Sequence, residues 1–124
     1  MANLFEIEAG LRSANEKERW AAAEAGGEFV LSRPRAVWNL VLAHGVSPVE
    51  DVRSAVAACM LEHLLEEHFE DYFPLLEQEV HSGKLLLGDT LRRSWKMGRA
   101  ELPGNSARWD DLVSYAKREL AGGK

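Results

Sequence analysis

The feature that most constrains this sequence is residues 47–66 (SPVEDVRSAVAACMLEHLLE), a continuous run of helix-forming and apolar side chains. Ser47 offers a side-chain oxygen to the free N–H groups of a first helical turn, and Pro48 has the backbone angle that the first helical position needs. Asp51 adds a negative charge near the positive end of the helix dipole. No further proline occurs until Pro74. The pattern predicts a helix that begins at the Ser47 cap and runs through this stretch.

The apolar positions of this predicted helix cover a much wider arc than a surface helix needs. They are Val49, Val52, Ala55, Val56, Ala57, Ala58, Cys59, Met60, Leu61, Leu64 and Leu65. Such a helix must be covered by neighbours on more than one side, and its small residues would let those neighbours approach closely. We therefore expect this stretch at the centre of the fold, with Cys59 as a buried packing residue rather than a nucleophile.

The start of the same stretch carries a resemblance to a known family. Asp51-Val52-Arg53, followed by Ala55, Ala57 and Leu61, resembles the second helix of a HEAT-like (armadillo-type) repeat. Glu18-Arg19-Trp20-Ala21-Ala22-Ala23 lies 34 residues before Val52-Arg53-Ser54-Ala55-Val56-Ala57, and a third copy begins at Thr90-Leu91-Arg92, although Trp95 and Lys96 replace its small residues. The resemblance covers residues 4–101. It implies an all-α fold, a short right-handed stack of antiparallel helical hairpins with six or seven helices.

Caps and breakers divide the rest of the chain into further helices. We expect a short capping helix over residues 4–11, a helix from the Asn15 cap to Leu31, and a helix over residues 36–43 that follows the Arg33-Pro34 boundary and buries Trp38. Gly26-Gly27 either kinks the second of these or lets another backbone cross it closely. We also expect a turn near His68 and a helix that Asp71 caps. The prediction ends with an apolar arm containing Leu91, Trp95 and Leu102, and with a last helix that begins at Ser106.

Length and composition bound the organisation of the chain. A chain of 124 residues with 46% apolar residues predicts one domain, residues 1–121, followed by a frayed tail at residues 122–124. The single cysteine excludes internal disulfides and thiolate metal clusters. The opening is short and acidic, and no long apolar run occurs, so we expect a cytoplasmic protein without membrane association and without a cofactor.

The charges are distributed unevenly along the chain, whose net charge is −5. Between Arg53 and Lys84 there is no Lys or Arg, whereas the acids Glu62, Glu66, Glu67, Glu70, Asp71, Glu77 and Glu79 all fall there. After Lys84 the basic residues outnumber the acidic ones. Two interpretations remain open: the acidic and basic faces neutralise one another within the fold, or the acidic segment is offered to a basic partner.

The residues 63–68 (HLLEEH) raise the alternative of a metal site at His63, Glu67 and His68. Histidine ligands on one helix normally lie one turn apart, whereas a spacing of five residues places them about 140° apart around the axis. We find neither Gly-x-Ser-x-Gly nor a glycine-rich phosphate loop in the sequence. Catalysis is therefore not expected.

A second alternative concerns nucleic acids, because a family of DNA glycosylases is also built from HEAT-like repeats. Arg92, Lys96 and Arg99 have helical spacing that would place them on one face, with Trp95 nearby. A nucleic-acid interface normally needs a broad basic surface, however, and this chain is acidic overall. Nucleic-acid binding is thus not the expected function.

These patterns favour a non-catalytic protein–protein interaction module whose partner has a basic surface. The predicted contact residues are Glu66, Glu67, Glu70 and Asp71, with Tyr72 as an aromatic anchor. Size and charge also resemble small acidic bacterial immunity or adaptor proteins. The alternative is a small metal-dependent or nucleic-acid-processing enzyme on a HEAT-like scaffold. The partner's identity and the oligomeric state stay open.

Overall fold

The computed structural model describes residues 3–122, and all regular secondary structure in that range is helical. The elements are α1 (Leu4–Leu11), α2 (Glu16–Gly27), α3 (Pro34–His44), α4 (Glu50–Val56), the π-helical turn η1 (Ala57–Leu61), α5 (Glu62–His81), α6 (Leu85–Arg92), the 3-10 turn η2 (Gly98–Glu101) and α7 (Pro103–Gly122). The predicted all-α class is confirmed.

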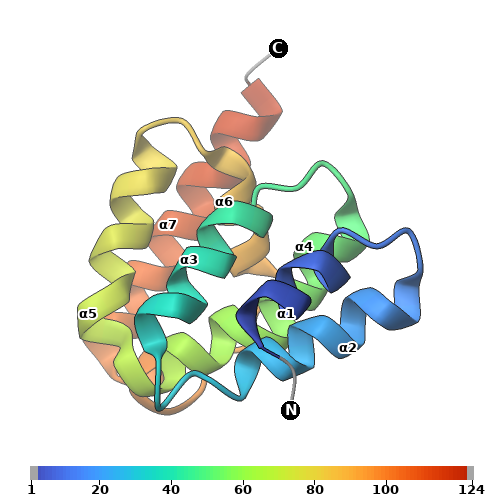
Figure 1. The fold of residues 1–124 in the computed structure, drawn as a ribbon. Coiled ribbons are helices and arrows are strands. Elements are labelled where there is room, and N and C mark those ends of the chain that lie inside the picture. Colours follow the sequence, from blue (N-terminus) through green and yellow to red (C-terminus); the bar gives the residue numbers. More distant parts are fainter. Residues whose placement is uncertain (1–2, 123–124) are drawn as a thin grey trace.

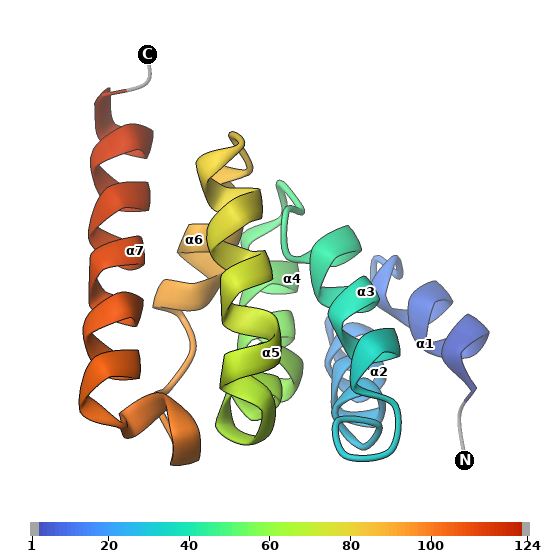
Figure 2. The same ribbon diagram turned by 90° about the vertical axis from the view of Figure 1, so that its left-hand side faces the viewer.

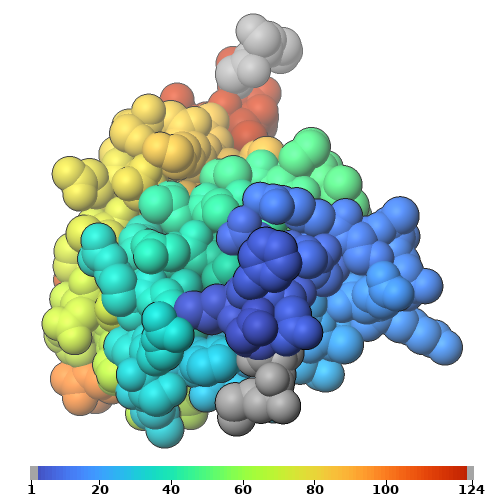
Figure 3. Space-filling model, viewed as in Figure 1, coloured from blue at the N-terminus to red at the C-terminus, as the bar shows by residue number. Residues whose placement is uncertain are grey.

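The helices lie side by side in chain order, with α1 at one end of the molecule and α7 at the other (Figure 2). One layer contains α3 and the later part of α5, and the other contains α2, α4 and α6 (Figures 1 and 2). Figure 3 shows α1 on the outside of this arrangement, over α2 and α3. One continuous apolar core extends from Ile7 to Ala116.

The predicted central helix is central, although its start differs from the prediction. Elements α4, η1 and α5 follow one another without a gap, and Ala55, Ala57 and Leu61 are fully buried. The first helical residue is Glu50, and the Ser47 side chain does not cap the helix. The Ser47 hydroxyl oxygen accepts a hydrogen bond from the Val49 N–H at 3.1 Å, and the Ser47 carbonyl accepts one from Arg53 at 2.7 Å.

The glycine pair at the end of α2 marks a close crossing of two backbones. A methyl group on Gly27 would collide with the carbonyl oxygen of Cys59, and one on Gly26 would lie 2.7 Å from the Met60 sulfur. Both neighbours belong to η1, whose wider π-helical turn interrupts the regular helix at this point. The sequence left open whether Gly26-Gly27 kinks the helix or lets another backbone cross closely, and the structure shows the close crossing.

The predicted break near His68 occurs as a kink. His68 has non-helical backbone angles (φ −134°, ψ 39°), and its ring Nε2 lies 3.1 Å from the Val30 carbonyl oxygen. The helix resumes at Phe69, so the predicted Asp71 cap is wrong. Stacking of Phe69 on Phe73, with ring centroids 4.4 Å apart, places the new segment in the core directly after the kink.

Two arginines that are 34 residues apart make the same pair of contacts. Arg19 donates to the Ser13 carbonyl at 3.1 Å and to Asp51 at 2.8 Å, which links α2 to α4. Arg53 donates to the carbonyl of Ser47, which also lies six residues earlier, and to Asp89 at 3.0 Å, which links α4 to α6. The internal similarity of the sequence therefore corresponds to a repeated structural contact.

The N-terminal helices follow the sequence prediction closely. Helix α1 has the predicted bounds, and the Asn15 side chain caps α2 by accepting from the Glu18 N–H at 3.1 Å. Helix α2 ends at Gly27 rather than at Leu31, since the crossing with η1 stops it there. Arg33 precedes α3 in a non-helical conformation, and Trp38 is buried as predicted.

The C-terminal third differs more from the prediction. Helix α6 ends at Arg92, so no continuous apolar arm reaches Leu102, and Trp95 is exposed. Helix α7 begins at Pro103 rather than at Ser106, because proline suits the first turn of a helix. Of the predicted tail, Gly122 is the last residue of α7, and residues 123–124 lie outside the described range. Within residues 3–122 there is no helix with the length and apolarity of a membrane span.

Candidate acidic docking groove

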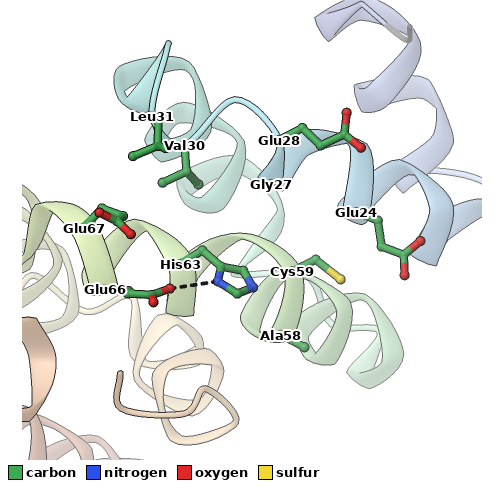
Figure 4. Close-up of a pocket in the computed structure, with 10 residues that line it drawn as sticks. All are labelled: Glu24, Gly27, Glu28, Val30, Leu31, Ala58, Cys59, His63, Glu66 and Glu67. Carbon is green, nitrogen blue, oxygen red and sulfur yellow. Dashed lines mark hydrogen bonds and ion pairs between the residues drawn. The ribbon is translucent and has the colours of Figure 1, made fainter. Parts of the chain in front are cut away.

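A cavity of about 480 Å³ opens at the surface between the end of α2 and the first turns of α5 (Figure 4). We call it the acidic groove and define it by its ten lining residues: Glu24, Gly27, Glu28, Val30, Leu31, Ala58, Cys59, His63, Glu66 and Glu67. One wall comes from α2 and the turn after it, and the other comes from η1 and α5.

Local geometry explains why the groove lies here. The close crossing of Gly27 over Cys59 joins the two walls at one end. After Gly27 the chain forms a turn that includes Val30. The carbonyl oxygen of Val30 contacts the His68 ring of α5, and this contact fixes the turn. Val30 is buried, whereas Leu31 is 72% exposed at the rim. The groove therefore combines apolar surface with acidic walls.

Four glutamates line this cavity, two from each wall, and its lining contains no Lys or Arg. Within the described part of the chain, Glu24, Glu28 and Glu67 form no ion pair with a basic side chain. Glu66 lies 3.2 Å from His63 Nδ1. The groove thus concentrates negative charge that the fold does not neutralise with Lys or Arg.

Cys59 and His63 lie between the two walls. Burial, followed by the nearby charges of Glu24 and Glu62, raises the pKa of the Cys59 thiol to about 11. The thiol is therefore protonated at neutral pH, which does not suit a nucleophile or a thiolate ligand. This agrees with the packing role that the sequence predicts for Cys59, although the residue is only partly buried.

The predicted contact residues have different positions. Glu66 and Glu67 line the groove, whereas Glu70 bonds to Arg99 at 2.5 and 2.9 Å and to Asn105 at 3.1 Å. Hydrogen bonds from Arg99 and then Asn105 lower the pKa of Glu70 to about 2. Asp71 is exposed but does not line the groove.

The prediction that Tyr72 is an exposed aromatic anchor is wrong. Its side chain is only 8% exposed and packs against Trp38, with ring centroids 6.0 Å apart. Tyr72 follows Phe69 by three residues and precedes Leu76 by four, and both of these are fully buried, so helical spacing places Tyr72 on the core face.

The three basic residues proposed as a nucleic-acid face do not share a helix. Arg92 ends α6, Lys96 lies in the turn that follows, and Arg99 belongs to η2. Arg92 bonds to Asp89 at 2.8 Å, Lys96 to Asp110 at 2.7 Å and Arg99 to Glu70. Only Arg99 pairs with a residue of the acidic segment, so the interpretation that the acidic and basic segments neutralise one another is confirmed for Arg99. Arg92 and Lys96 pair with acids of their own segment.

The residues of the alternative metal site also point to different partners. His68 contacts the Val30 carbonyl, His63 contacts Glu66, and Glu67 lies in the groove wall. Residues 3–122 contain no group of three or more His, Cys, Asp or Glu side chains that could hold a metal ion.

The sequence prediction did not include the wall that α2 contributes. Glu24 and Glu28 are one helical turn apart, which predicts a shared exposed face but not what that face meets. Comparison with known proteins does not identify the groove, because no family model, no curated protein and no solved structure matches the chain.

Proposed function

We propose that this protein is a HEAT-like interaction module, a short right-handed stack of helical hairpins that docks a protein partner without catalysis. The repeated contacts of Arg19 and Arg53 support this assignment, because they link successive helices of one layer in the same way. The arrangement of the helices in chain order also supports it.

The observation that carries the proposed function is the set of glutamates without basic partners in the acidic groove. Several acids elsewhere in the chain pair with arginine or lysine, as in Glu70–Arg99 and Lys96–Asp110. Placing Glu24, Glu28 and Glu67 around one cavity without a cation raises their mutual repulsion. A partner that inserts lysine or arginine side chains there relieves this repulsion and gains charge-assisted hydrogen bonds.

A docking module of this kind suits the role of a small acidic immunity or adaptor protein, which covers a basic surface of another protein. The groove supplies charge complementarity, and the exposed Leu31 supplies apolar surface at its rim. We do not propose the alternative of a metal-dependent or nucleic-acid-processing enzyme, because the residues suggested for it are not brought together.

Two variants with the same net charge test the proposal. The groove variant carries Glu24→Gln, Glu28→Gln, Glu66→Gln and Glu67→Gln. The surface variant carries Glu16→Gln, Glu101→Gln, Asp111→Asn and Glu119→Gln at exposed positions outside the groove. Each set of four changes moves the net charge from −5 to −1 (−5 + 4 = −1). General attraction to a polycation therefore falls equally in both.

The measurement is the affinity of a dye-labelled, end-capped hexa-arginine peptide, determined by fluorescence anisotropy at two salt concentrations. We expect the groove variant to bind at least about tenfold more weakly than the surface variant, because only it lacks the convergent carboxylates. Equal affinities of the two variants would contradict the groove as the docking site. Thermal unfolding of both variants checks that each is folded.

A further inference from the structure

Trp95 is the most exposed of the tryptophans, with 74% of its surface accessible. Trp38 and Trp109 are buried in the core, and the Trp20 ring nitrogen donates to Asp51 at 3.1 Å. A single exposed apolar side chain needs no special explanation. The position of Trp95, however, connects it to the acidic groove.

Buried groups of the central helix hold the turn that carries Trp95. The Trp95 backbone N–H donates to Glu62 at 2.9 Å, and Glu62 is only 9% exposed. The other carboxylate oxygen of Glu62 lies 3.8 Å from Nε2 of His63, a groove residue. Further along, Gly98 packs so closely on Glu66 that an added methyl group would lie 2.8 Å from the Glu66 side chain. The turn therefore lies directly beside α5 residues that line the groove or contact it.

The cations nearest to Trp95 in the sequence are already paired with carboxylates. Arg92 bonds to Asp89 at 2.8 Å, Arg93 to Glu50 at 2.6 Å, and Lys96 to Asp110 at 2.7 Å. In the described residues, the contacts between a cation and an aromatic face place Arg108 over Phe69 and Phe73. Within residues 3–122, no cation of the protein therefore lies over the Trp95 ring.

We propose that Trp95 is the aromatic anchor of the docking surface and makes that surface select arginine over lysine in the partner. The occupant is a basic segment with two or more arginines, one against the groove glutamates and another on the Trp95 ring. A guanidinium stacks on an indole face and bonds a carboxylate in a bidentate way, whereas an ammonium does neither as well. The backbone bond to Glu62 holds the turn in place, which lowers the entropy cost of docking. This inference rests on the proposed function of the groove.

The test compares end-capped hexa-arginine with end-capped hexa-lysine, which carry the same charge, on the full chain. We expect the wild type to bind hexa-arginine about five- to tenfold more tightly than hexa-lysine, as expected for a stacked guanidinium. Trp95→Ala should lose most of this preference by weakening hexa-arginine binding, while hexa-lysine binding changes less than about twofold. Phe5→Ala, at a position 83% exposed on α1, should leave both affinities unchanged.

Two outcomes would overturn the inference: an arginine preference that persists in Trp95→Ala, or a preference that is absent in the wild type. Neither outcome affects the proposed function, which fails only if the groove and surface variants bind hexa-arginine equally. Because the side chain of Trp95 is exposed, its removal leaves the core intact, and a thermal melt of Trp95→Ala confirms this.

Discussion

Two junctions of the central segment η1–α5 with its neighbours are built in different ways. At the junction with α2, the backbone of Gly27 closely approaches that of Cys59 in η1, and the glutamates on both sides have no Lys or Arg partner. At the junction with η2 and α7, ion pairs cross the contact, as in Glu70–Arg99 and Glu77–Arg108. Arg108 also lies 5.4 Å from the centroid of the Phe73 ring.

The difference shows that the two ends of one acidic run meet different surroundings. Where a basic segment of the same chain follows, the carboxylates form ion pairs with it, and hydrogen bonds from Arg99 and Asn105 lower the pKa of Glu70 to about 2. Where α2 faces the run, the added residues Glu24 and Glu28 are acidic as well, so no Lys or Arg lines the groove between them. The first junction leaves its carboxylates without a Lys or Arg partner, and the second pairs them with arginines of the same chain.

The largest expected effect tests where the buried side of the central helix ends. Ala57 is fully buried, whereas its neighbour Ala58 lines the acidic groove. Ala57→Asp places an unpaired charge in the core, which costs more than about 4 kcal/mol and should prevent folding. Ala58→Asp should fold, because its carboxylate reaches solvent. Circular dichroism melts distinguish the two, and a cooperative transition for Ala57→Asp would show that the centre of the fold is misplaced.

A smaller effect is expected from filling the close crossing at the first junction. Gly27→Ala should lower the free energy of unfolding by about 2 to 3 kcal/mol, because the added methyl group meets the Cys59 backbone, which has no rotamer to change. Gly104→Ala is the matched control, since an added methyl group there has nothing within 4 Å. Chemical denaturation of both variants measures the difference. Equal stabilities would mean that packing does not hold the junction.

The smallest expected effect concerns the pH dependence of the paired region. Burial tends to raise the pKa of Asp89, but hydrogen bonds from Arg93, Arg92 and Arg53 outweigh it and lower the pKa to about 2. A carboxylate with a lowered folded-state pKa stabilises the fold above its ordinary pKa, here 3.8, and loses this contribution as pH falls toward the folded value. Asp89→Asn should therefore be less stable than the wild type at neutral pH by roughly 1 to 2 kcal/mol.

Denaturation at pH 7, 4 and about 2 measures the difference in unfolding free energy between the wild type and Asp89→Asn. This difference should narrow as the pH falls from the ordinary pKa of Asp89 toward its folded-state pKa. Asn39→Ala, an uncharged change at an exposed position, should give a curve parallel to that of the wild type. If this stability difference stays constant with pH, the Asp89 carboxylate does not stabilise the fold through its charge.

The sequence predicted features that depend on neighbouring residues. Helix α1, the Asn15 cap and the boundary at Arg33-Pro34 were predictable because capping, periodicity and proline geometry act within a few residues. Burial of the central helix was predictable as well, since its apolar arc requires cover on several sides. Tyr72 was mispredicted from its acidic neighbours, whereas its helical spacing with the buried Phe69 and Leu76 places it on the core face.

What the sequence by itself determined is the all-helical class, the helix at the centre and the excess of acid in the middle of the chain. Only the tertiary structure decided which acids meet a cation. Glu67 and Glu70 are three residues apart, yet one faces Glu24 and Glu28 across a cavity while the other bonds to Arg99. The physical reason is that helix formation depends on local backbone energetics, whereas the field at a carboxylate depends on charges that only folding brings close.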